Sequence, residues 1–226
     1  MIRMIVLLVC AALLLGQMHP FPGPGRATGG TAGDSSASII ETDTGGYNSG
    51  ATRQWTVAGA TVGDYILVFL ANEEDVGLTS VADNQTNSYS ELQTSTTAPF
   101  SRAYYAVVAT TASTVVTVTY ASTTTNYFSC LLVRGAVGID DSDKAAGVGA
   151  NISVTLTTTL NNVLLAGVYI GGQDPTAQSG FTTLHDSAYN IYSLAERYLT
   201  NIAGSNPVGV TADSHAANRF VGVAIK

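Results

Sequence analysis

The sequence predicts an all-β protein, an antiparallel β-sandwich of two sheets built from two related halves. Three observations support this. Apolar residues recur with a period of two in almost every apolar segment after residue 38, as they do in strands. Thr, Val, Ser and Gly are abundant, and β-branched side chains pack well on a pleated surface. A similar phrase occurs twice, as "NYFSCLLVR" at 126–134 and as "NRFVGVAIK" at 218–226.

The first element is a predicted signal peptide over residues 1–17. One cation, Arg3, precedes an apolar run from Met4 to Leu15, which is shorter than the ~20 residues needed to span a bilayer. We expect cleavage between residues 16 and 27, with an uncleaved membrane anchor as the alternative. Cys10 would leave with this leader, and Cys130 is then expected to be a small buried hydrophobe.

Residues 18–37 are rich in Pro, Gly and Ser and predict a linker or arm, followed by a single domain over 38–226. The domain begins with the short apolar patch that contains Ile39 and Ile40. Such a strand can pair within its own domain, or it can add to the sheet edge of a neighbouring subunit as an assembly arm.

The strands that follow are predicted from alternation or from short apolar runs between turn-forming clusters. They cover residues 64–72, 102–110, 113–120, 126–135, 152–157, 162–171, 189–199, 207–212 and 218–226. The separating turns are predicted at residues 83–87, 121–126, 171–180 and 203–207. Strands 64–72 and 162–171 are apolar on both sides, which predicts that both of their faces are covered. Strand 113–120 alternates Val inward with Thr outward.

The repeated phrase predicts the two halves, at about 62–135 and 160–226. Seven residue pairs are identical at an offset of 92, from Ser113 with Ser205 to Phe128 with Phe220. Weaker echoes upstream match "LTSVAD" (78–83) with "FTTLHD" (181–186) and "DYILVFLA" (64–71) with "NVLLAGVY" (162–169). Each half alone would expose an apolar sheet face, so we expect the two faces to pack on each other.

Three motifs, "VGDYILVFLAN", "SVADNQTNSY" and "RGAVGID", resemble exported β-sandwich modules of bacterial surface proteins and of virus tail or fibre proteins. This resemblance covers roughly residues 50–226. It implies a jelly-roll-type core and export, and it implies no catalytic activity.

Composition and motifs argue against several function classes. The net charge of −7 and the lack of a basic stripe exclude nucleic acid as an expected partner. The chain has no HExxH, CxxC or G-x-S-x-G motif. Asp213, Ser214 and His215 are adjacent at a predicted loop tip, where we interpret the cluster as coincidence. We therefore expect a protein that is not an enzyme.

The remaining site candidates are binding or modification residues. Asp140, Asp141 and Asp143, in a predicted loop, are oxygen ligands suited to Ca²⁺, although solvated loop charge is the simpler interpretation. The acidic cluster at 73–75 has the same two readings. Exposed aromatic rings would stack on sugars, and the candidates are Tyr89, Tyr189, Tyr192 and Trp55. Asn84 and Asn151 begin Asn-x-Ser/Thr sequons and are candidate glycosylation sites.

These features predict a secreted structural protein at or outside the cell surface, a subunit that assembles with copies of itself into a filament, fibre or coat. The alternative is a lectin-like module or adhesin that binds polysaccharide. No cofactor is expected apart from Ca²⁺.

Overall fold

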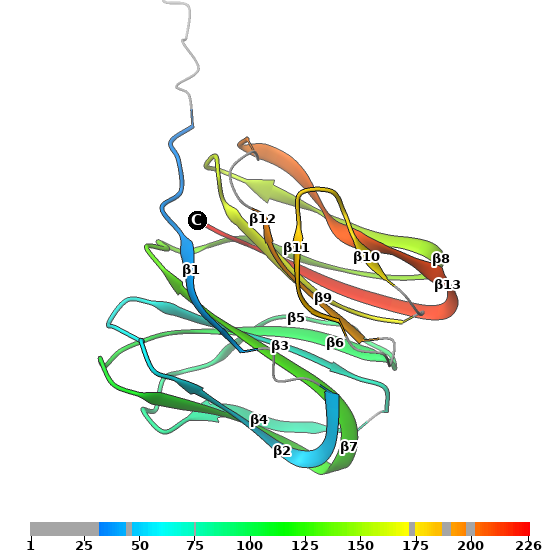
Figure 1. Ribbon diagram of the computed structural model, residues 1–226, viewed down its shortest axis with the longest axis horizontal. Helices are drawn as coiled ribbons and strands as arrows, with labels where there is room; N and C mark the ends of the chain where they lie inside the picture. The colour runs from blue at the N-terminus through cyan, green and yellow to red at the C-terminus, as the bar shows by residue number, and fades with distance from the viewer. Residues whose placement is uncertain (1–31, 44–46, 75, 172–174, 187–190, 198–201) are drawn as a thin grey trace, which may run out of the picture. The chain divides into compact units, whose positions relative to one another are not determined.

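Every regular element in the computed structural model is a β-strand within the residues that it describes, which are 32–43, 47–74, 76–171, 175–186, 191–197 and 202–226 (Figure 1). The first seven strands are β1 (Ser38–Asp43), β2 (Tyr47–Val57), β3 (Tyr65–Asn72), β4 (Leu78–Asp83), β5 (Ser90–Thr94), β6 (Phe100–Val107) and β7 (Thr114–Arg134). The other six are β8 (Ile139–Thr158), β9 (Leu164–Ile170), β10 (Thr176–Ala177), β11 (Thr182–Asp186), β12 (Ile191–Arg197) and β13 (Gly204–Ile225). The all-β prediction is confirmed.

The strands form two antiparallel sheets, one from each half of the domain. Strands β1 to β7 form the first sheet in the order β1-β7-β3-β6-β5, and β2 and β4 also pair with β7. Strands β8 to β13 form the second in the order β10-β13-β9-β12-β11, with β8 also on β13. We call residues 38–134 the first half and residues 139–225 the second half.

The long strands β7 and β13 each take part in two layers. The first part of β7 pairs with β2 and β4, and its last part pairs with β1 and β3. Val116 and Val118 from the first part share one core cluster with Cys130 and Leu132 from the last part, so the sheet folds back on itself. The second sheet does the same around β13.

In its described residues the domain therefore has four layers and three cores, where the sequence predicted two layers face to face. In Figure 1 the order of layers runs from β2 and β4, through β3, β5 and β6, then β9, β11 and β12, to the β8, β10 and β13 layer. The central core lies between the two inner layers and joins Leu67, Phe69 and Leu131 of the first half to Val168 and Val223 of the second.

The two inner central strands are buried on both faces, as predicted. Alternate residues of β3 point into different cores: Leu67 and Phe69 into the central one, and Ile66 and Val68 into the core of the first half. All seven residues of β9 are buried. Each such strand needs apolar side chains on both sides because each face meets a separate core.

The predicted turn at 121–126 is wrong, because β7 continues through it. The chain bends there within one continuous strand, and the pairing with β2 passes from Gly50–Thr124 to Thr52–Thr119, which is a register shift opposite the bend. A bulge of this kind bends a strand while the ladder persists. Similarly, 207–212 and 218–226 belong to the single strand β13, whose register with β8 shifts near His215 and Asn218.

The two halves have the same strand pairing, although their limits differ from those predicted. β7 and β13 coincide at the predicted offset of 92, and β3 and β9 occupy equivalent positions. The proposed match of 78–83 with 181–186 is wrong: β4 pairs with the long strand as β10 does, whereas β11 pairs with β12 as β5 pairs with β6. Each half also includes an earlier strand, β1 and β2 in the first and β8 in the second, which the predicted limits left out.

The end of the predicted linker that the structure describes is bonded to the domain. Asn161 and residues 33–35 exchange backbone hydrogen bonds, Ser35 N donating to Asn161 O at 2.8 Å, and the Ser36 hydroxyl donates to Gly135 O at 2.7 Å. Gly135 has φ of +76°, and a Cβ there would lie 2.5 Å from Ser36 O. This explains the first glycine of the "RGAVGID" motif, because only a residue without a Cβ allows the backbone of Ser36 to lie so close.

Candidate functional site

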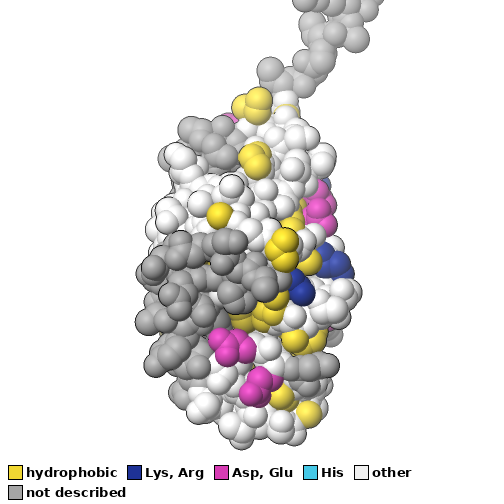
Figure 2. All heavy atoms as spheres, turned by 90° about the vertical axis from the view of Figure 1, so that its right-hand side faces the viewer, with side chains coloured by type: hydrophobic (Ala, Val, Ile, Leu, Met, Phe, Trp, Pro, Cys, Tyr) yellow, Lys and Arg dark blue, Asp and Glu magenta, His cyan; other side chains and the backbone are white. Residues whose placement is uncertain are grey.

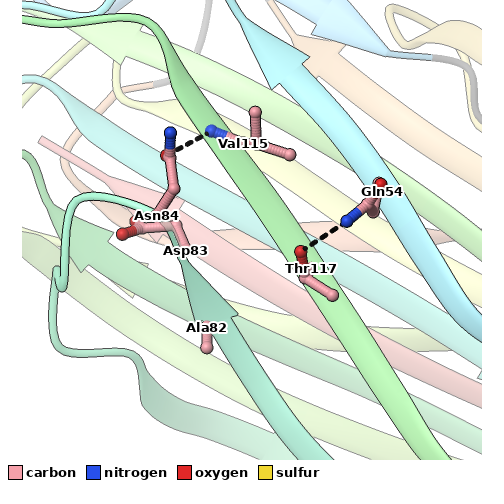
Figure 3. Close-up of a pocket in the computed structure, with 6 residues that line it drawn as sticks. All are labelled: Gln54, Ala82, Asp83, Asn84, Val115 and Thr117. Atoms are coloured by element: carbon pink, nitrogen blue, oxygen red, sulfur yellow. Dashed lines mark hydrogen bonds between the residues drawn. The ribbon is translucent and has the colours of Figure 1, made fainter.

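The candidate site is a shallow depression on the outer layer of the first half, where β2, β7 and β4 lie side by side (Figure 3). Its volume is about 260 Å³. The lining residues are Gln54, Ala82, Asp83, Asn84, Val115 and Thr117.

Strand register brings these residues together. Thr117 on β7 has Gln54 of β2 on one side and Ala82 of β4 on the other. The Gln54 amide donates to the Thr117 hydroxyl at 3.3 Å, and the Asn84 side-chain oxygen accepts from Val115 N at 2.7 Å (Figure 3). The depression thus offers neutral amide and hydroxyl groups, which suit uncharged hydroxylated ligands.

Asp83 is occupied by its own loop and is not available as a catalytic base. Its carboxylate accepts four hydrogen bonds, from Gln85 N at 2.9 Å, from Asn87 N at 3.1 Å, from the Asn87 amide at 2.8 Å and from the Tyr89 hydroxyl at 2.9 Å. The motif "SVADNQTNSY" is therefore a self-bonded turn centred on Asp83. Its order comes from local side-chain-to-backbone bonds of the Asx type.

The predicted aromatic platform is not assembled by the side chains that the structure describes. Trp55 is buried in the core of the first half. Tyr89 packs against the same core, and burial together with its hydrogen bond to Asp83 raises the pKa of its hydroxyl, which stays a donor. Tyr189 and the side chain of Tyr192 lie outside the described residues.

The predicted acidic loop at 140–143 is instead part of strand β8. Asp140 accepts from Thr159 N and the Thr159 hydroxyl and pairs with Lys226 Nζ at 3.0 Å. Asp141 accepts from Thr157 N at 2.7 Å, and Asp143 is exposed and accepts from Lys144 N. The three carboxylates are thus bonded to separate protein donors, and among the described residues they do not form a group that could hold a metal ion.

No group of three or more His, Cys, Asp or Glu side chains that could hold a metal ion is found in the described part of the chain. In the other acidic cluster, Glu73 and Glu74 are exposed, and Asp75 lies outside the described residues. The side chains of Asp213, Ser214 and His215 also lie outside them.

The other candidates are placed as follows. Asn84 borders the depression and Asn151 lies on β8, and both side chains are exposed. Ile39 packs against the central core and Ile40 is 44% exposed. Their strand, β1, pairs with β7 of the same chain, which is the intrachain alternative.

Two kinds of polar contact were not predicted from the sequence. One joins two of the sequence motifs, and the other joins the layers of each half. Arg134 donates to both carboxylate oxygens of Asp64, at 3.0 and 2.7 Å, and so joins "VGDYIL" to "RGAVGID". The Glu41 carboxylate of β1 accepts from Ala58 N and Gly59 N, as Asp141 of β8 accepts from Thr157 N. Each carboxylate bonds the outer layer of its half to the inner one.

No known protein family, curated protein or solved structure matches this chain. In the residues that the structure describes, there is no helix of the length and apolar character needed to cross a membrane.

Proposed function

We propose that this protein is a secreted structural subunit that assembles with its own copies at the cell surface by exchange of strand β1. The main support for this proposal is that β1 is an edge strand of its sheet. Its only pairing partner among the described strands is β7. Copies of one chain can exchange such an edge strand, since each β7 accepts the same backbone ladder from either source.

The surface supports a structural role. Charged residues make up 11% of the chain, and most described side chains on the face drawn in Figure 2 are uncharged. Low charge density reduces repulsion between copies that lie side by side.

We also infer that the two halves are duplicated sandwich units of jelly-roll type, related to exported surface modules. In each half the long strand pairs with the same set of neighbours, and successive strands β1 to β4 alternate between the inner and outer layers. The apolar segment predicted as a leader over residues 1–17 supports export. The first unit would supply the exchanged strand.

A cysteine opposite Cys130 tests the exchange. Asp43 is the register partner of Cys130 across β1 and β7, a spacing that a disulfide can bridge. In full-length protein that carries Cys10→Ser and Asp43→Cys, we expect oxidation of assembled material to give covalent dimers and longer ladders on non-reducing gels.

The Cys10→Ser protein without the new cysteine is the control and should stay at the monomer position. Peptide mass mapping identifies the 43–130 disulfide in each band. If that disulfide forms only within single chains at every protein concentration, β1 does not exchange and the proposed assembly is wrong.

A lectin-like role is the second candidate, and the depression with Gln54, Asn84 and Thr117 favours it. Its neutral amides and hydroxyls are the groups that bind sugar hydroxyls. We expect Gln54→Ala to weaken binding to a neutral oligosaccharide about tenfold, as the loss of one ligand hydrogen bond would. The measurement is affinity electrophoresis through neutral polysaccharide gels.

Thr56→Ala is the matched control, because Thr56 lies two residues along β2, is exposed, and does not line the depression. Equal retardation of both variants and the parent chain would contradict binding at this depression.

A further inference from the structure

One end of the core in the first half holds two arginines where the rest of that core is apolar. Arg53 lies two residues before Trp55 on β2. Arg102, on β6, is the register partner of Leu70 on β3. Trp55 and Leu70 both belong to the core of the first half. The guanidinium carbon of Arg102 lies 5.0 Å from the centre of the Phe100 ring.

Four polar atoms at this end are buried and have no hydrogen-bond partner among the described residues. Three are donors, Arg53 Nη2, Arg102 Nε and the Tyr120 hydroxyl, and one is an acceptor, Asn72 Oδ1. Asn72 is fully buried, and Tyr120 is 3% exposed. The ion pairs found among the described residues, Arg134–Asp64 and Lys226–Asp140, involve neither Arg53 nor Arg102.

These groups lie around one point of the fold. Arg53 Nε donates to Asn126 Oδ1 at 2.7 Å, and Asn126 is the register partner of Asn72. Asn72 in turn is opposite Phe100 on β6. Both arginines are close enough to act on the pKa of Tyr120. Burial raises this pKa, the charges of Arg102 and Arg53 act to lower it, and the net value is about 12.

In the second half, neutral residues stand at the strand positions that correspond to this end. Asn218 corresponds to Asn126, and its Oδ1 accepts from the Tyr169 hydroxyl at 2.9 Å where Asn126 accepts from Arg53. Strand register places Ile152 at the position of Arg53, Tyr192 at that of Arg102 and Ala212 at that of Tyr120. Both asparagine amides donate to a glycine carbonyl, of Gly50 in the first half and of Gly149 in the second.

The fold therefore does not require the two cations. Buried donors without partners are unfavourable, and two guanidinium groups near each other add charge repulsion. A residue pair that costs stability in one half, and is replaced by neutral residues in the other, indicates a ligand of opposite charge.

We propose that this end of the first half, with Arg53, Asn72, Arg102 and Tyr120, binds the carboxylate of an acidic sugar, a hexuronate unit. The three donors match the oxygens of a carboxylate, for which guanidinium groups have the right geometry. The remaining acceptor, Asn72 Oδ1, matches a sugar hydroxyl. Both arginines are only partly buried whereas the four atoms are buried, so the ligand would reach them when the two arginine side chains move aside.

The test measures the thermal unfolding of the full chain with sodium glucuronate, with sodium phosphate and with glucose, each at matched ionic strength. We expect glucuronate to raise Tm by about 5 °C at roughly 100 times its Kd, because a ligand that binds only the folded state stabilises it by mass action. Glucose should have no effect, and phosphate should have a smaller one.

Arg53→Ile, Arg102→Gln and the double variant should abolish the shift. Arg53→Ile copies the second half and is expected to keep the fold. Lys144→Gln is the charge-matched control, since Lys144 is exposed on β8 and its Nζ bonds to Thr94 O.

Three results would overturn the proposal. They are no shift with glucuronate, a shift that survives in both arginine variants, and an equal shift with phosphate, which would mean that the site responds to charge alone. None of these depends on assembly through β1, so the site and the proposed function fail separately.

Discussion

Phe69→Ala is expected to lower the free energy of unfolding by about 3–5 kcal/mol, as removal of a buried Phe side chain does. Phe69 is fully buried in the central core, between Ala103 and Ser129 in its own layer and against the inner layer of the second half. Domains of this size are stable by about 5–15 kcal/mol, so the loss is a large share of the total. The measurement is urea unfolding followed by Trp55 fluorescence and by circular dichroism.

The same substitution should also reduce the cooperativity between the two halves. The central core is where apolar side chains of both halves meet, and Trp55 reports only the first half. We therefore expect the two probes to coincide in the parent chain and to separate in Phe69→Ala.

Phe128→Ala is the matched control, because Phe128 is buried in the core of the first half and not in the central one. It should cost a similar free energy while the two probes still coincide, because the central core that couples the halves is intact in this variant. A cost below 1 kcal/mol for Phe69→Ala would mean that the two inner layers do not pack on each other in solution.

The sequence predicted those features that depend on side chains alternating along one strand. Period-two patterns locate the core strands, and apolar residues on both sides of 64–72 and 162–171 identify β3 and β9 as strands between two cores. The offset of 92 identifies β7 and β13 as equivalent.

The bends of β7 and β13 could not be predicted in this way. The residues 121–126 are polar and turn-forming in any local reading, and pairing of 124–126 with the neighbouring strand β2 is what makes them part of a strand. The number of layers depends on these bends. A prediction in which the strands end at residues 121–126 therefore gives two layers and one core. Such long-range pairing overrides local propensity.

One signal for the missed strand equivalence is present in the sequence. "SIIETD" (38–43) and "GIDDSD" (138–143) align at an offset of 100, with Glu41 opposite Asp141. In the structure both segments run along the last part of a long strand, and both carboxylates bond to the backbone of the outer layer. The segment predicted as an assembly arm and the segment predicted as an acidic loop are thus equivalent elements of the two halves.

Asp64→Asn is expected to lower the free energy of unfolding by about 2 kcal/mol at pH 7, the size of a lost charge-assisted contact. The Asp64 side chain is 4% exposed and accepts from Arg134, from Thr61 N at 2.9 Å and from the Thr61 hydroxyl at 3.0 Å. An amide cannot accept on both sides, so at least one of these donors loses its partner.

The same contact predicts how stability changes with pH. Burial would raise the pKa of Asp64, but the hydrogen bonds from Arg134 and Thr61 outweigh burial and lower it. In Asp140 the bonds from Thr159 and Lys226 outweigh burial in the same way. Both folded-state pKa values then lie below the unfolded value of about 4, so this stabilisation is complete above that pH and is lost as the pH falls through the folded values.

Urea unfolding from pH 7 to pH 2 should therefore show a parent chain that loses stability below about pH 4. In Asp64→Asn the loss should be smaller, and the two curves should converge at the acid end. Asp143→Asn is the control, because Asp143 is exposed and, among the described residues, accepts from Lys144 N alone, and its curve should stay within about 0.5 kcal/mol of the parent. Parallel curves for Asp64→Asn and the parent would mean that the Asp64–Arg134 contact does not depend on the carboxylate charge, and that neutral hydrogen bonds alone join the two motifs.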